Sequence, residues 1–488
     1  MSMEWTLLIA AGLLILSIIA TRASNRFGVP GLILFLTIGI LAGSQGPGGI
    51  AFADYQLAQT VGVIALIYIL FSGGLDTDWK AIRPVLGQGM VLANLGVLLS
   101  AVIVGLFAMW LLGFSLLEAL LIGAIVSSTD AAAVFAVMRE RGVNLKHNLE
   151  PLIELESGSN DPIAVFLTLG LTGLLLNSNG SLFDLIPSFL LQMTLGALGG
   201  YGLGRLAVVI INRIRLQQEG LYVVLTLGLT LLIYAVVSLI GGNGFLAVYL
   251  AGIVIGNYNL VHKRSILRFH DGVAWLMQIA MFLTLGLLVF PAELIPVAGS
   301  GLLLALFLAF VARPLSVFAA LIWFRRGPAE ILMVSWAGLR GAVPIVLATF
   351  PLLAGVPHAG MVFNLVFFIV LVSVLLQGMT ISHVARWLKL NADRPRPPET
   401  QTYVPDVSLR SRMLDIVVPA DSPVVNKSLI QLDLPRGLLV VQIQRGEELL
   451  IPNGGTVLLP DDHLLVLATP EMLPKIEALH ARGELVIR

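Results

Sequence analysis

Long apolar runs separated by short polar connections fill the first 390 residues of the chain. Thirteen such segments can be counted, at residues 6–21, 30–44, 57–75, 87–112, 116–138, 150–176, 183–211, 219–240, 244–258, 271–290, 298–324, 328–352 and 360–385. Most of them reach the ~20 residues that an α-helix needs to cross the hydrocarbon core of a bilayer. The pattern therefore predicts an all-α polytopic membrane protein with about thirteen transmembrane helices.

The pattern changes after residue 390. Short β-rich runs alternate with turns there, at Leu414–Val418, Gly437–Ile443 and His463–Ala468, and one polar helix is expected near Glu471–His480. The last 98 residues also hold 23 of the 58 charged residues of the chain. The sequence thus predicts a membrane domain at residues 1–390, a proline-rich linker at 391–410 and a small α+β cytosolic domain at 411–488.

Lysine and arginine residues occur in every second connection between the apolar segments. They are Arg22 and Arg26, Lys80 and Arg83, Arg139, Arg141 and Lys146, Arg213 and Arg215, Lys263, Arg264 and Arg268, Arg325 and Arg326, and Arg386 and Lys389. The intervening connections hold none, and basic residues in short loops stay on the cytoplasmic side of a membrane. For an odd number of spans in the cell inner membrane, this alternation predicts a periplasmic N-terminus and a cytoplasmic C-terminus.

Composition narrows the function further. The chain is 57% hydrophobic and 12% charged, its mean hydropathy is +0.93, and its formal net charge is zero, so it offers no electrostatic footprint for a nucleic acid. It contains no cysteine, which excludes disulfides, thiolate metal sites and cysteine nucleophiles. No phosphate-binding loop motif is present, and neither a cofactor nor a metal is expected.

Several ionisable and hydroxyl side chains lie inside predicted spans, where a charge is costly unless it has a partner or a function. The fifth segment contains Ser127-Ser128-Thr129-Asp130, and the sixth contains Glu156-Ser157-Gly158-Ser159-Asn160-Asp161-Pro162. Ser157 and Asp161 are four residues apart and share a helix face, and Glu156 and Asn160 form a second such pair beside them. Such oxygen atoms suit a hard monovalent cation, and Pro162 frees one more backbone carbonyl in the preceding turn.

Two segments are interrupted midway by polar or small residues. The interruptions are Ser127–Ala133 in the fifth segment and Gly338-Leu339-Arg340-Gly341-Ala342-Val343-Pro344 in the twelfth. If spans one to six and eight to thirteen are two halves, both interruptions fall on the fifth helix of a half, which is typical of an inverted-repeat transporter with crossed, unwound helices. Asp130 and Arg340 would balance the dipoles of the half-helix ends that meet there.

These motifs resemble the signatures of monovalent cation:proton antiporters of the NhaP and NHE exchanger type. The residues that carry the resemblance are Ser128-Thr129-Asp130, Glu156 to Pro162, and Gly338 to Val343, and it covers the whole membrane part. The tail, over a shorter stretch, resembles the TrkA-C (RCK C-terminal) regulatory domain. Together they resemble the NhaP-type potassium/proton antiporters of bacteria.

The resemblance implies a role for each matching residue. Asp161 would hold either a proton or the cation, Ser157 and the backbone at Thr129 would add ligands together with Asn160, and Glu156 and Asn160 would tie to Arg340. This chain has an asparagine before Asp161 rather than a second aspartate, and in this it is similar to the electroneutral one-for-one exchangers.

The resemblance also implies an assembly, a homodimer whose tail senses a small ligand such as a nucleotide. The chain departs from the family at one position, because many relatives carry an acidic residue where this chain has Ser72. The sequence therefore offers no third carboxyl ligand at that position, and Asp76 is expected at the cytosolic end of its span.

Other functions compete with this interpretation. The same oxygen atoms bind sodium or potassium, so the sequence does not rank the two ions, although the tail favours potassium. A regulated channel would need a filter such as Thr-Val-Gly-Tyr-Gly, which the sequence lacks. An intramembrane protease using Asp130 and Asp161 fits the hydroxyl-rich cluster less well. The sequence therefore predicts a secondary transporter and not an enzyme.

Overall fold

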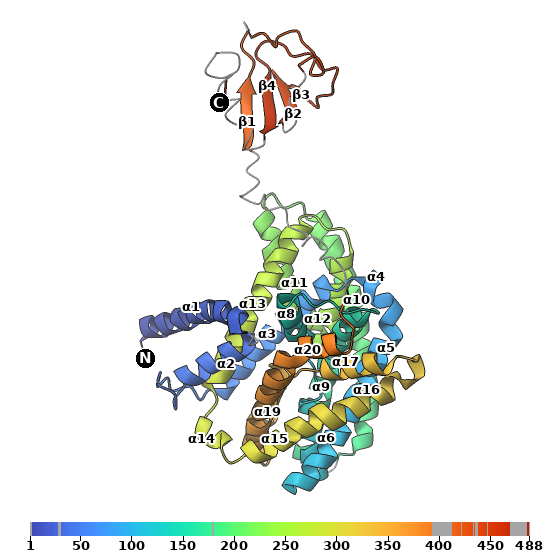
Figure 1. Cartoon of the computed structure of the whole chain (residues 1–488). Coiled ribbons are helices and arrows are strands. Elements are labelled where there is room, and N and C mark those ends of the chain that lie inside the picture. The colour runs from blue at the N-terminus through green and yellow to red at the C-terminus, as the bar shows by residue number, and fades with distance from the viewer. Residues whose placement is uncertain are drawn as a thin grey trace. The chain divides into compact units, whose positions relative to one another are not determined.

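The computed structural model describes residues 2–27, 31–177, 180–392, 412–420, 422–432, 434, 438–446, 448–468 and 486–487. The chain forms two compact units, residues 1–393 and 394–488. The first unit is helical and the second is built on a β-sheet (Figure 1).

The membrane unit consists of helices that follow the predicted apolar segments. They are α1 (Met3–Phe27), α2 (Gly31–Ala42), α3 (Tyr55–Asp76), α4 (Trp79–Ile82), α5 (Leu86–Val91), α6 (Val97–Leu112), α7 (Leu116–Ile125), α8 (Ala131–Glu140), α9 (Leu149–Leu176), α10 (Leu185–Arg213), α11 (Glu219–Leu239), α12 (Gly244–Asn257), α13 (Lys263–Leu287), α14 (Pro291–Leu294), α15 (Ala298–Phe307), α16 (Arg313–Leu321), α17 (Pro328–Trp336), α18 (Val343–Leu353), α19 (Ala359–Ser373) and α20 (Met379–Trp387). Tighter or wider helical turns join α4 to α6, α15 to α16 and α19 to α20 into continuous rods.

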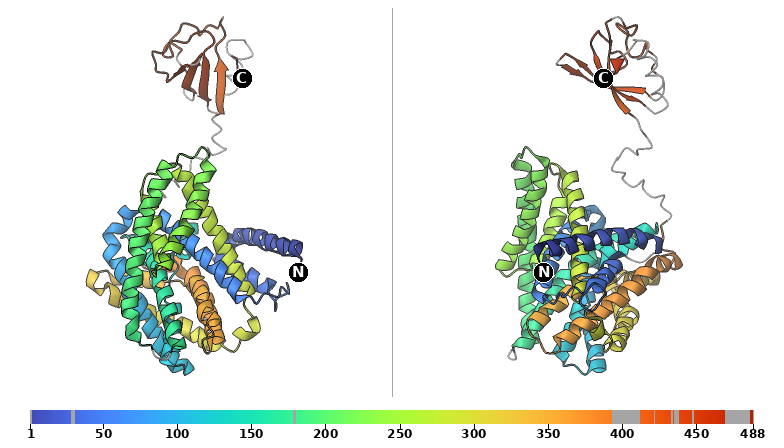
Figure 2. Two further views of the ribbon diagram at one scale, coloured as in Figure 1. Left: turned by 180° about the vertical axis from the view of Figure 1, so that it is seen from behind. Right: turned by 90° about the vertical axis from the view of Figure 1, so that its left-hand side faces the viewer.

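Nine of these helical stretches, among the described residues, are long and apolar enough to cross a membrane. Four shorter apolar helices, α2, α7, α12 and α18, complete the thirteen predicted segments. The prediction of a polytopic helical fold is therefore confirmed. The long helices α10 and α11 pack side by side along one flank of the unit, while α3 packs against both α12 and α13 (Figure 2).

The two predicted interruptions are real breaks in the helices. The fifth segment is split into α7 and α8 by residues 126–130, and the twelfth into α17 and α18 by residues 337–342. Serine, threonine and aspartate compete for backbone hydrogen bonds in the first break. In the second, two glycines weaken the helix, and Pro344 at the start of α18 has no N–H to continue a preceding turn.

The second unit is a five-stranded sheet in the order β3-β2-β4-β1-β5. Its strands are β1 (Arg412–Val417), β2 (Leu438–Arg445), β3 (Glu448–Leu450), β4 (His463–Ala468) and β5 (Val486–Ile487), and all the described pairs are antiparallel. The three predicted strands are confirmed within two residues, whereas β3 and β5 were not predicted. The helix expected near Glu471–His480 and most of the expected linker lie outside the described residues.

An ion pair between the partly exposed Arg445 and the buried Asp462 holds one turn of this sheet. The Arg445 guanidinium donates from Nε and Nη2 to the two carboxylate oxygens of Asp462, both at 2.8 Å, and Leu459 N donates to Asp462 at 2.8 Å. Burial alone would raise the pKa of Asp462, but these hydrogen bonds outweigh it and lower the pKa. The pair therefore stabilises the sheet above the ordinary aspartate pKa of 3.8, and this contribution is lost as the pH falls through the lowered value.

Candidate functional site

The two breaks lie against each other inside the membrane unit. Asp130 N donates to Leu339 O at 2.8 Å, which joins the first break to the second directly. Asp130 also caps α8, because its Oδ1 accepts from Ala133 N at 3.0 Å. A side chain at Gly341 would overlap the Asp130 carboxylate, so only glycine permits this approach.

Arg340, in the second break, caps the C-terminal end of α7. Its Nη1 donates to the carbonyl oxygens of Ser127 and Ser128, both at 2.9 Å, where α7 has ended and these carbonyls have no helical partner. The guanidinium is 1% exposed and therefore sits deep in the fold. A positive charge at a helix C-terminus offsets the dipole, as predicted for this residue.

Helix α9 brings the predicted site residues against the first break. The Asp161 carboxylate accepts a hydrogen bond from Ser128 Oγ. Ser157 Oγ donates to Thr129 O at 2.7 Å and accepts from Ala131 N at 2.9 Å. Asp161 is only 6% exposed, so its charge has little access to water. The i,i+4 spacing of Ser157 and Asp161 thus places both on the face that meets the unwound chain.

Asn160 supports the first break through hydrogen bonds to Thr129. Its Nδ2 donates to Thr129 Oγ1 at 2.6 Å, and its Oδ1 accepts from Thr129 N at 3.5 Å. Asn160 is fully buried and does not line the cavity that opens onto Asp161. The structure therefore places this amide beside Thr129. The sequence had suggested that it would bind the cation and tie to Arg340, whereas in this structure it lies neither among the cavity oxygens nor against Arg340.

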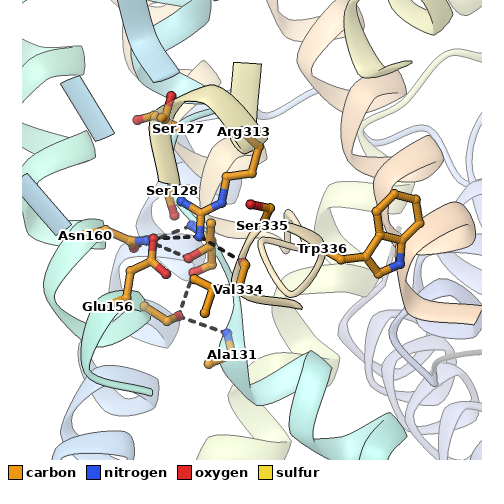
Figure 3. Close-up of polar contacts among 12 residues, drawn as sticks. Ser127, Ser128, Ala131, Glu156, Asn160, Arg313, Val334, Ser335 and Trp336 are labelled. Carbon is orange, nitrogen blue, oxygen red and sulfur yellow. Dashed lines mark hydrogen bonds and ion pairs between the residues drawn. The ribbon is translucent and has the colours of Figure 1, made fainter. Parts of the chain in front are cut away.

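Glu156 pairs with Arg313, which corrects the predicted tie to Arg340. Arg313 Nη2 lies 2.6 Å from Glu156 Oε1, both side chains are 2% exposed, and Figure 3 shows the guanidinium reaching down to the carboxylate. The same nitrogen also approaches Val334 O at 3.5 Å, near the end of α17. A side chain at Gly338 would overlap Arg313, so this glycine makes room for it.

A cavity of about 560 Å³ opens onto Asp161. Oxygen-bearing groups that line it are Asp76, Thr77, Thr129, Asp130, Glu154, Ser157, Asp161, Tyr249 and Gln278. A smaller cavity of about 170 Å³ shares Asp76, Arg139 and Gln278 with the larger one and also reaches Ser72 and Asp271. Because Asp76, Arg139 and Asp271 are exposed, the cavity runs from the buried aspartate toward the face that carries Arg139.

Three members of this site had no role assigned to them from the sequence. Ser128 was known only as part of a motif, yet it bonds Asp161. Glu154 accepts from Thr77 Oγ1 at 2.7 Å, which ties α9 to α3. Tyr249 lines the cavity with a buried hydroxyl that has no hydrogen-bond partner in the described structure, and its ring fills the space left by Gly158. The i,i+7 spacing of Glu154 and Asp161 was a usable signal, whereas a lone tyrosine in an apolar segment gives none.

Comparisons with known proteins agree with this geometry. The family described as "Sodium/hydrogen exchanger, transmembrane" matches residues 12–387, and the TrkA-C domain matches residues 413–481. The chain is 42% identical to the K(+)/H(+) antiporter NhaP of Alkalimonas amylolytica and 40% identical to the K(+)/H(+) antiporter NhaP2 of Shewanella oneidensis. Each alignment covers 98% of this chain and 83% of the relative.

A solved structure has the same fold in its membrane part. The sodium proton antiporter MjNhaP1 of Methanocaldococcus jannaschii superposes with a TM-score of 0.68 at 26% sequence identity. The superposition covers 79% of this chain and 99% of that one.

Proposed function

Because this chain belongs to the sodium/hydrogen exchanger family, we propose that it is a secondary antiporter that exchanges potassium ions for protons across the cell inner membrane. The observation that carries the proposal is the buried Asp161 at the end of a cavity, between two unwound helices whose hydroxyl and carbonyl oxygens surround it. Potassium is favoured over sodium because the relatives at 40–42% identity, which align along the tail as well, are named for potassium.

Exchange follows from the cost of a buried charge. An ionised carboxylate with little water around it must be neutralised, either by a proton or by a cation. A single carboxylate cannot hold both at once, so the proton and potassium compete for Asp161. Ser157 Oγ and Thr129 O provide neutral oxygen ligands next to it, while Asn160, Glu156, Asp130 and Arg340 hold the two breaks in place. One carboxylate and one asparagine support an electroneutral, one-for-one exchange.

Alternating access requires that Asp161 face each side in turn. With the periplasmic N-terminus and cytoplasmic C-terminus that the basic connections favour, the face carrying Arg139 is cytoplasmic. The cavity that reaches Asp161 then opens inward, and the structure corresponds to the inward-facing state. Movement of α9 and the two breaks as one body would close this cavity and open another on the periplasmic side.

The experiment that tests the proposal is proton flux in everted membrane vesicles. A pH-sensitive dye is quenched by respiration-driven acidification, and potassium or sodium salts are then added at equal ionic strength. We expect potassium to dequench the dye at lower concentration than sodium. Equal responses to both salts would remove the potassium assignment, and a sodium response alone would make the chain a sodium/proton antiporter of the same fold. A current through the protein that does not saturate and moves no protons would instead identify a channel.

The tail is proposed to regulate transport rather than to form the pathway. The sheet has its own core of Ile416, Val418, Val440, Ile443, Leu464 and Val466, separate from the core of the helices. A homodimer with a small ligand, such as a nucleotide, on the tail is the assembly that we propose from the TrkA-C resemblance. A ligand can shift transport only if it binds the transporter's conformations with different affinities.

Truncation after Asp393 tests the role of the tail. We expect the shortened protein to keep potassium-dependent proton flux and to change either its rate or the pH of half-maximal activity. The measurement is a pH series in vesicles that hold equal amounts of full-length and truncated protein. Complete loss of transport at normal protein levels would make the tail part of the pathway, and superimposed curves would remove its regulatory role.

A further inference from the structure

A histidine–glutamate pair lies at the start of the broken helix α17. His147 is in the connection that precedes α9, and its Nδ1 lies 2.9 Å from Oε1 of Glu330. Glu330 is the third residue of α17. The His147 side chain is 59% exposed and that of Glu330 is 16% exposed, so the imidazole is open to water on one face of the membrane unit.

A second pair of the same kind lies at the start of the other broken helix. His358 is the residue before α19, and its Nδ1 lies 2.9 Å from Oε1 of Glu118. Glu118 is the third residue of α7. The two side chains are 61% and 11% exposed, which matches the first pair closely.

The two pairs are equivalent under the exchange of the two halves of the fold. In each, a glutamate in the first turn of a broken helix meets a histidine just before the unbroken helix that follows the other broken helix. His147 and His358 also share a left-handed backbone, with φ of 60° and 58°. Agreement in distance, helix position, exposure and backbone conformation is not expected of two unrelated surface contacts, since exposed ion pairs form in many geometries.

We propose that these pairs are two pH-dependent latches, one on each side of the membrane, and that His147 and His358 are positioning residues for the ion site. Each latch fastens the first turn of a broken helix to the start of an unbroken one, α9 or α19. The contact is a neutral hydrogen bond when the imidazole is uncharged and a stronger, charge-assisted one when it is protonated. The inference rests on the proposed antiport function and on the proposed orientation.

The latches bear on the site through the helices they hold. The inner latch, His147–Glu330, fixes the beginning of α9, which carries Asp161, to α17, which leads into Arg340. The outer latch, His358–Glu118, fixes α7, which leads into Ser128, to the beginning of α19. At the other end of α19, Ser373 Oγ accepts a hydrogen bond from Arg340 N at 3.0 Å. Loosening either latch therefore loosens one end of the arrangement around Asp161, although neither histidine touches the cation.

The neighbours of the two latches differ in charge. At the inner latch, Arg326 Nη1 lies 3.1 Å from Oε2 of Glu330 and donates to His147 O at 2.9 Å, with Lys146 and Glu150 beside the histidine in sequence. The inner glutamate thus keeps a cationic partner when His147 is neutral.

At the outer latch, uncharged donors take the place of Arg326. Ser115 N and Oγ donate to Glu118 at 2.9 and 2.7 Å. The Phe114 ring stacks on the His358 ring with centroids 5.3 Å apart. The charge on His358 should therefore matter more than the charge on His147.

The test uses His147→Gln and His358→Gln, which keep a hydrogen-bonding side chain but cannot gain a charge. His262→Gln is the matched control, because His262 Nδ1 lies 3.7 Å from Glu219 and joins α11 to α13 without touching a broken helix. Potassium-dependent proton flux is measured in oriented proteoliposomes whose inner and outer pH are set independently.

We expect His147→Gln to shift the half-maximal pH on the cytoplasmic face by about 0.5 unit and to leave the other face unchanged. His358→Gln should shift the half-maximal pH on the periplasmic face by at least as much and leave the cytoplasmic face unchanged. His262→Gln should shift the half-maximal pH on neither face. Wild-type curves on both faces for both variants would overturn the latches. The same shifts on exchanged faces would support the latches and reverse the orientation.

A second measurement keeps the inference separate from the proposed function. The melting temperature of the detergent-solubilised protein is compared at pH 5 and pH 8. Because a latch is stronger when its histidine is charged, the loss of stability in His147→Gln and His358→Gln should be larger at pH 5. Equal losses at both pH values would contradict the latches whether or not the protein transports potassium, while absent flux in the wild type would contradict the proposed function alone.

Discussion

Asp161→Asn is expected to reduce potassium-dependent proton flux to the background of vesicles without the protein, while the protein remains folded. The amide has nearly the same shape as the carboxylate and can still accept a hydrogen bond from Ser128 Oγ. It can neither release a proton nor balance the charge of a cation, so both halves of the exchange are lost. The measurement is dye dequenching in vesicles, with the amount of protein in the membrane determined in parallel.

A matched control separates the site from the mere loss of a carboxylate. Asp184 is exposed in the connection before α10, and Asp184→Asn keeps a side chain that can cap a helix turn. This variant should transport at close to the wild-type rate. Retention of even a third of the wild-type flux in Asp161→Asn would contradict the assignment of this residue.

Arg313→Met is expected to destabilise the membrane unit by about 3–5 kcal/mol, because it leaves Glu156 as an unpaired buried charge. Methionine fills much of the same space, so the loss is mainly electrostatic rather than a cavity. The double variant Arg313→Met/Glu156→Gln should recover at least half of the lost stability, since it removes both charges. Thermal unfolding of the detergent-solubilised protein provides the measurement.

The control for this prediction is Arg268→Met on the exposed part of α13, which should leave the melting temperature nearly unchanged. An equally stable Arg313→Met would mean that Glu156 draws its counter-charge from elsewhere, for instance from Arg340. Failure of the double variant to recover stability would mean that Arg313 acts through its packing and through Val334 O instead of through the ion pair.

The fold was largely predictable because a bilayer imposes a simple rule on the sequence. Each crossing must be a long apolar helix, and each interruption must be polar or flexible, so the thirteen segments and both breaks could be found by pattern alone. The positions of Ser157, Thr129 and Asp161 followed from helix spacing and from the motifs. Short edge strands such as β3 give no such signal, because three residues do not establish a period.

The charge pairs could not be assigned in the same way. Two buried arginines, Arg313 and Arg340, were both available to Glu156, and both are far from it in sequence. Which of them forms the pair depends on the packing of α16 against the second break, where Gly338 leaves room for Arg313. Arg340 is turned instead toward the carbonyls of Ser127 and Ser128, a backbone partner that no side-chain pattern reveals.

In the proposed mechanism, a proton and a potassium ion compete for the one carboxylate of Asp161. The most direct test is the apparent KM for potassium of the wild-type protein, measured in proteoliposomes over a series of pH values on the cytoplasmic face. Competition predicts that the KM rises as the pH falls, approaching about tenfold per pH unit at the acid end, while the maximal rate at saturating potassium stays constant. A KM that does not change with pH while the maximal rate falls would show that the two ions bind at separate sites, and would contradict competition at Asp161.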